Sequence, residues 1–311
     1  MTAVVCTGVR WGAGGAAVLG GRRARPQEHA AADPGPREPA LPLAPGCVLA
    51  LRTTGPRRCL GVQRAGRHTP CPGERAVPAH LTRAQCEECA RVDRAHSVAA
   101  DTAPADPRTY RVYLAWFGPG MVKSGITAAE RERLRLLEQG AVAFTWLGQG
   151  PLMAARRTEE LLRSALGVPD RVPYADKRAA RSRLPSAAER AAELTALHTA
   201  AAALLPGGAE ALDWLPAKVV DQAEDFGLAG LPPANALLTG LVPGAALGGT
   251  LLAVAGPDLY LRQSDGRVLI ADGRLLAGWP FTASAAPGGA RTDAVTDAPV
   301  RELPAEQPAL F

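Results

Sequence analysis

The sequence predicts an α+β protein, in which a small three-stranded sheet with flanking helices lies between a β-rich N-terminal region and a region that passes from helix to strands. Short apolar runs bounded by Gly and Pro, the pattern of β-strands, mark residues 1–100. Strand and helix patterns alternate over residues 109–185. Over residues 186–284, an Ala-rich helical segment leads into apolar runs separated by Asp-Gly turns. These patterns predict helices and sheets in one chain.

Length and composition are those of a globular protein. The chain has 311 residues, of which 47% are hydrophobic, enough for two domains that each bury a core. No apolar run reaches the roughly 18 residues of a membrane span, and the N-terminus lacks the long apolar core of a signal peptide. We therefore expect a cytoplasmic protein with no membrane partner. A formal net charge of +5 permits a polyanionic partner without requiring one.

The N-terminal region contains two apolar runs that we predict to be strands, Val4–Val9 and residues 47–51. Residues 20–45 between them are rich in Pro, Arg and Ala and show no periodicity. We expect this segment to be a loop or a disordered insertion. Residues 285–311 combine Pro and acidic residues with few apolar ones, so we expect a disordered tail.

Four cysteines in this region have the spacing of a metal site. Cys86 and Cys89 form a Cys-x-x-Cys knuckle, and Cys71 stands in a Cys-Pro-Gly turn that can direct its sulfur inward. With Cys59 they supply the four thiolates that a tetrahedral zinc ion requires. Such a site leaves no coordination position open, so we predict that the zinc is structural and takes no part in chemistry.

Other interpretations of the cysteines remain open. The Cys-x-x-Cys pair could be redox-active, or the thiols could be unrelated buried groups. His68 or His80 could replace one cysteine as a ligand, although each is more simply a loop histidine. Cys6 and Cys47 lie in strand-like runs and are interpreted as small buried hydrophobic residues.

The middle segment predicts a β-β-α-β-α order. Residues 110–117 and 121–126 are apolar runs separated by Gly-Pro-Gly, which indicates a hairpin. Thr127 and Glu130 have capping-box spacing, so we predict a helix from there to about Glu138. Residues 141–147 follow as a strand, and Pro151 opens a second helix that ends at Gly167.

Glu159 occupies an unusual place in this second helix. At about 100° per residue, it projects among the apolar side chains of one helix face, Leu152, Ala155, Leu162 and Leu166. A carboxylate is costly to bury unless it is paired or binds a cation. The pattern therefore predicts either a buried ion pair or a cation site at Glu159.

The order and spacing of several residues in this segment resemble the GIY-YIG nuclease superfamily. The residues that carry the resemblance are Val112-Tyr113-Leu114, Lys123-Ser124-Gly125, Arg133 and Glu159. The Lys-x-Gly-Ile-Thr form of the second motif is similar to the branch in which lysine replaces the second tyrosine. No residue matches the asparagine that usually follows the second helix, since neither Asp170 nor Asp176 is in its place.

The resemblance implies a site and an activity. Tyr113 would help activate a water molecule, Arg133 would stabilise the phosphate, and Glu159 would bind a single magnesium ion. Lys123, Gly125 and Thr127 belong to the motif that meets the substrate. The implied fold is a three-stranded sheet with helices packed beside it, and these residues would converge on one face of it.

The wider pattern is similar to an uncharacterised bacterial family known only as domain of unknown function 2797. The cysteine-containing segment, residues 59–89, and a C-terminal segment, Gly256-Pro257-Asp258-Leu259-Tyr260-Leu261, carry this similarity. The family name implies no activity.

A basic stretch follows the middle segment, with residues Arg171, Lys177, Arg178, Arg181 and Arg183. It could be a solvated face, or it could contact phosphates, chiefly through Arg178 and Arg181. Three functions are therefore compatible with the sequence. The first is a divalent-metal-dependent endonuclease that hydrolyses phosphodiesters, with DNA as the expected nucleic acid partner. The others are a non-catalytic, zinc-containing nucleic-acid-binding protein and a protein-interaction module.

Overall fold

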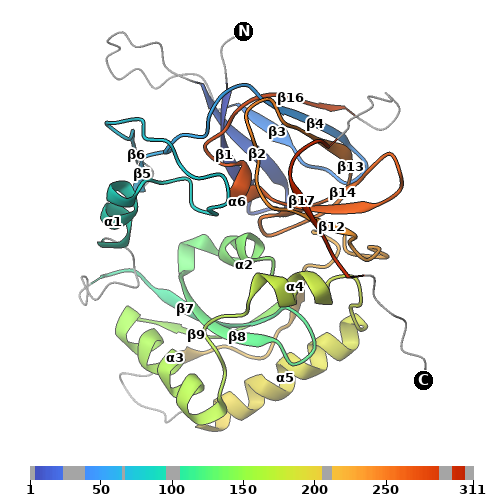
Figure 1. Cartoon of the computed structure of the whole chain (residues 1–311). Helices are drawn as coiled ribbons and strands as arrows, with labels where there is room; N and C mark the ends of the chain where they lie inside the picture. Colours follow the sequence, from blue (N-terminus) through green and yellow to red (C-terminus); the bar gives the residue numbers. More distant parts are fainter. Residues whose placement is uncertain are drawn as a thin grey trace. The chain divides into compact units, whose positions relative to one another are not determined.

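The computed structural model describes residues 4–23, 39–64, 67–95, 106–204, 212–286 and 296–304, and Figure 1 shows its helices and strands. The fold is mixed α+β, which confirms the predicted class. The chain forms two compact units. The first draws on the described residues of Met1–Gly12, Ala16–Ala100 and Pro232–Phe311, and the second on those of Ala13–Gly15 and Asp101–Leu231.

The first unit is built on a ten-stranded sheet that joins both ends of the chain. Its order is β17-β12-β15-β14-β13-β4-β16-β1-β2-β3, with β12 and β15 parallel and the other neighbours antiparallel. The strands are β1 Val4–Trp11, β2 Ala17–Arg23, β3 Ala40–Pro42, β4 Val48–Thr53, β12 Ala236–Leu238, β13 Ala246–Ala255, β14 Asp258–Arg262, β15 Val268–Asp272, β16 Pro280–Ala286 and β17 Val300–Glu302. A short helix, α6 (Gly273–Leu276), follows β15.

This sheet combines strands from two regions that the sequence analysis treated as separate. Strand β4 lies between β13 and β16, so the N-terminal strands and those of residues 236–286 share one sheet. Of the expected loop at 20–45, β2 and β3 occupy the two ends, and residues 24–38 lie outside the described residues. Strand β17 lies within the expected tail, of which residues 287–295 and 305–311 lie outside the described residues. Strand pairing between distant segments is decided by the whole core, which short patterns do not reveal.

The cysteine module, residues 57–95, is attached to this sheet by Arg57. The module contains a hairpin of β5 (Val62–Arg64) and β6 (Arg67–Thr69), and helix α1 (Glu87–Ala95). The buried Arg57 guanidinium donates to the carbonyls of Pro78 and Leu81 at 2.7 and 2.6 Å, and to those of Arg274 and Ala277 at 3.0 and 2.8 Å. One side chain therefore ties the loop before Cys86 to α6, in the same unit.

The second unit contains a sheet with the order β10-β9-β7-β8, in which β11 also pairs with β9. Its strands are β7 Tyr110–Trp116, β8 Val122–Ala128, β9 Ala143–Gly150, β10 Asp213–Trp214 and β11 Val220–Asp221. Its helices are a 3₁₀ turn at Ala129–Arg131, α2 Leu134–Gln139, α3 Leu152–Leu166, α4 Tyr174–Ala180 and α5 Ala187–Leu204. Three strands of the predicted order, β7, β8 and β9, are antiparallel neighbours, and two short strands extend the sheet beyond them.

Two expectations from the sequence are not met in this unit. Thr127 pairs with Arg111 inside β8, so it does not cap a helix, and α2 begins only at Leu134. Pairing with β7 provides hydrogen-bond partners for the backbone groups that the helix cap was expected to satisfy. The Ala-rich helix, α5, packs on β7 and β9, so residues 186–284 divide between the two units. Among the described residues, no helix has both the length and the apolar character needed to cross a membrane.

Candidate functional site

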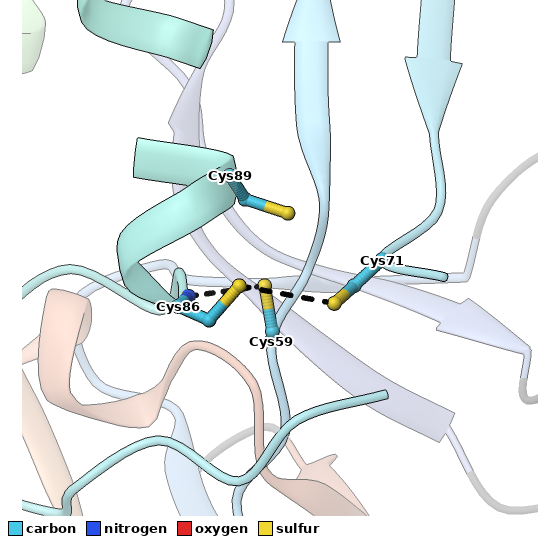
Figure 2. Close-up of side chains that lie close together, drawn as sticks. All are labelled: Cys59, Cys71, Cys86 and Cys89. Atoms are coloured by element: carbon cyan, nitrogen blue, oxygen red, sulfur yellow. Dashed lines mark hydrogen bonds between the residues drawn. The ribbon is translucent and has the colours of Figure 1, made fainter. Parts of the chain in front are cut away.

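Four cysteine sulfurs converge in the cysteine module. Cys59 precedes β5, Cys71 follows β6, and Cys86 and Cys89 lie at the start of α1. Their sulfur atoms all lie within 4.8 Å of one another, and Figure 2 shows the four side chains directed toward a common centre. The predicted cysteines are therefore brought together and could hold a zinc ion.

The four sulfurs differ in their surroundings. The backbone N–H groups of Gly61 and Cys86 donate to Cys59 Sγ at 3.3 and 3.2 Å, and the sulfurs of Cys71 and Cys86 are 3.9 Å apart. Burial acts to raise the pKa of Cys71, but hydrogen bonds from the backbone of Arg75 and Gly73 and with the sulfurs of Cys59 and Cys86 lower that pKa to about 7. Burial raises the pKa of Cys59 and of Cys89. Four thiolates at this separation repel one another unless a cation lies between them, so a zinc ion fits this donor set.

The other residues considered as ligands lie apart from the cluster. Nε2 of His68 lies 2.6 Å from the Leu60 carbonyl oxygen, and His80 is exposed. Cys6 is buried in β1, where its sulfur accepts a hydrogen bond from Gly8 N at 3.3 Å. Neither Cys6 nor Cys47 belongs to the group of four sulfurs found among the described residues.

A second group of polar side chains gathers around Tyr113 in the other unit. Tyr113 on β7 faces Gly125 on β8 in the strand register, and its ring packs where a Gly125 side chain would lie. Gln139, the last residue of α2, donates to the Tyr113 hydroxyl at 2.9 Å. The Tyr113 ring meets Trp146 edge-on, with the ring centres 6.3 Å apart. Tyr113 is buried, and its burial raises its pKa.

Lys123 and Glu159 complete this group, which we call the tyrosine–glutamate cluster (Tyr113, Lys123, Gly125, Gln139 and Glu159). Lys123 Nζ lies 5.8 Å from the centre of the Tyr113 ring and donates to the Asp170 carbonyl at 3.2 Å. Burial lowers the pKa of Lys123 to about 8. Helix α3 packs against β7 and β8 and carries the half-buried Glu159. Burial raises the pKa of Glu159, and the charge of Lys123 opposes that rise.

Arg133 does not join the cluster. It occupies the N-cap position of α2, and its guanidinium pairs with the Asp225 carboxylate. Arg135, one turn before Gln139 on the same helix, is the arginine whose charge acts on Tyr113 and Lys123. Positions 135 and 139 are four residues apart and so share a helix face. This spacing could have identified Arg135.

The remaining residues assigned to substrate binding lie in different surroundings. Thr127 is buried within β8, and the guanidinium of the half-buried Arg178 lies 5.6 Å from the Tyr174 ring centre. Arg181 is only 1% exposed, so it cannot reach a phosphate in solution. Lys177 is also buried, with its Nζ 3.8 Å from the Phe117 ring centre. Part of the basic stretch therefore packs into the unit.

Replacing Gly125 by alanine is expected to destabilise the second unit by about 1–3 kcal/mol. An added Cβ would lie 2.2 Å from the Tyr113 hydroxyl oxygen and 2.3 Å from its Cζ, so the buried ring would have to move. Urea unfolding followed by tryptophan fluorescence measures the change. Gly14→Ala is the control, because an added Cβ there meets no heavy atom within 4 Å. Equal stabilities of the two variants would contradict the packing described.

A family model described as "Protein of unknown function (DUF2797)" matches residues 46–280. The match covers more than half of the chain, and it includes the four cysteines and the whole tyrosine–glutamate cluster. No curated protein and no solved structure matches the chain.

Proposed function

The chain belongs to the DUF2797 family of proteins of unknown function, and from the tyrosine–glutamate cluster we propose that it is a divalent-metal-dependent endonuclease, with DNA as its substrate. The observation that carries the proposal is the half-buried Glu159 on α3, which packs against β7 and β8, the strands that carry Tyr113 and Lys123. A carboxylate, a tyrosine hydroxyl and cationic side chains are the groups that phosphodiester hydrolysis uses. The likeness of this segment to the GIY-YIG pattern adds to the proposal.

Each residue of the cluster has a role in the proposed reaction. Glu159 would hold a magnesium ion, which supplies Lewis-acid stabilisation of the charge that develops on the phosphate. Tyr113 accepts a hydrogen bond from Gln139, which fixes the hydroxyl, and the second lone pair of its oxygen would accept a hydrogen bond from the attacking water. Lys123 and Arg135 would neutralise the phosphate. Below a pH of about 8, Lys123 is mostly charged and can take this role.

A non-catalytic nucleic-acid-binding protein is the second candidate. The ion pair of Arg133 with Asp225 favours it, because it engages the arginine that the GIY-YIG resemblance assigns to the phosphate. Binding without cleavage needs only the phosphate contacts and the metal-supported scaffold.

An incubation with nucleic acid separates the two candidates. Purified protein is mixed with supercoiled plasmid, and with structured DNA and RNA, in magnesium or manganese. We expect nicked and linear plasmid to accumulate with time, and EDTA to stop the reaction. A salt-sensitive gel shift without any product would favour the non-catalytic protein. No binding even at low salt would exclude both candidates.

A further inference from the structure

The sequence of the cysteine module is rich in positive charge. Between Arg57 and Arg94 the sequence contains eight arginines, no lysine and four acidic residues. A zinc ion with four thiolates would contribute a net charge of about −2, which this excess of arginine more than offsets. The module therefore carries a net positive charge even with a metal ion bound to its thiolates.

Four of these arginines have no partner that the structure describes. Arg67, Arg83, Arg91 and Arg94 are exposed, and among the described residues none of them makes an ion pair or a side-chain hydrogen bond. Other arginines of the module are already engaged with protein groups. Arg57 is bound to buried carbonyls, Arg58 donates to the Glu74 carbonyl at 2.8 Å, and Arg75 pairs with Glu88 at 2.9 Å.

Each of the four stands close in sequence to a cysteine of the metal centre. Arg67 lies in β6, four residues before Cys71, and Arg83 lies three residues before Cys86. Arg91 and Arg94 follow Cys89 on α1, three residues apart, so they share one side of the helix. A metal ion bound to the cysteines would hold in place the backbone segments from which these arginines extend.

We propose that this set, Arg67, Arg83, Arg91 and Arg94, is the surface on which the protein holds the phosphate backbone of a nucleic acid, and that the metal centre organises it. Arginine suits this role because its planar, permanently charged fork matches phosphate oxygens. The basic stretch that first suggested such contacts is less suited, because Lys177 and Arg181 are buried. Contacts to phosphates alone bind without sequence preference. The inference rests on the proposed function, since it names where the substrate is held.

The test is a fluorescence-polarisation titration of a labelled duplex DNA at several salt concentrations, in EDTA-free buffer without magnesium. The variant Arg67→Gln/Arg83→Gln/Arg91→Gln/Arg94→Gln is compared with the wild type. We expect its affinity to fall by at least about 10-fold at low salt. The slope of log K against log salt should flatten by roughly 0.9 for each phosphate that the variant no longer neutralises. The two-residue variant Arg91→Gln/Arg94→Gln should show an intermediate decrease in affinity.

Arg75→Gln/Glu88→Gln is the matched control, because it removes an exposed ion pair of the same module without changing the net charge. It should bind within about 2-fold of the wild type. Zinc content equal to wild type in the arginine variants shows that the metal centre is intact. If the arginine variants bind the duplex as tightly as the wild type does, this inference alone is overturned. Absence of wild-type binding at low salt overturns the proposed function as well.

Discussion

Substituting Cys86 by serine is expected to release the zinc ion and to unfold the cysteine module. Structural zinc contributes roughly 10–16 kcal/mol of apparent binding free energy in small zinc-finger peptides, so the loss of one ligand removes a large share of what holds such a module. The cysteines themselves form the apolar cluster of the module, together with Val62 and Val77. Elemental analysis should find about one zinc per wild-type chain and much less in the variant.

The destabilisation should extend beyond the metal itself. Arg57 belongs to the module and donates to the carbonyls of Arg274 and Ala277, so a module that unfolds leaves these two carbonyls without that donor. We therefore expect a lower unfolding temperature for the first unit, which circular dichroism can measure. Cys47→Ser is the control, because Cys47 lies outside the sulfur cluster. Wild-type stability in Cys86→Ser, or a wild-type protein without zinc, would refute the assignment of a structural metal.

The second large effect concerns cleavage. Glu159→Gln is expected to lower the rate of metal-dependent phosphodiester cleavage by at least about 100-fold, because the amide keeps the shape of the side chain but cannot supply an anionic ligand. Binding to DNA should remain or become slightly tighter, since a negative charge near the phosphate is removed. Folding should be preserved, because burial already disfavours the charged form of Glu159. Plasmid cleavage and gel shift on the same preparation measure both quantities.

Glu160→Gln is the matched control on the same helix. Glu160 is exposed and pairs with Arg163, so its substitution should leave cleavage unchanged. Equal cleavage by Glu159→Gln and the wild type would exclude Glu159 as the metal ligand. Loss of both cleavage and binding in Glu159→Gln would instead indicate a structural role for the carboxylate.

The sequence by itself determined the features that depend on a few neighbouring residues. The members of the sulfur cluster followed from the Cys-x-x-Cys knuckle and the turn at Cys71, because metal geometry restricts ligand type and number. The hairpin of β7 and β8 followed from two apolar runs around Gly-Pro-Gly, and the end of α3 from Gly167, which adopts the left-handed conformation with φ 65°. The α+β class followed from these local patterns together.

Only the tertiary structure decided which distant groups meet. Thr127 pairs within the sheet and does not cap a helix, so α2 begins later than expected. As a result, Arg135 lies near Tyr113, and Arg133 pairs with Asp225. Packing likewise buried Arg181, and pairing joined β4 to strands from the C-terminal part of the chain. Such choices depend on the free energy of the whole core, in which burial and long-range pairing outweigh local propensity. No short window of sequence contains that information.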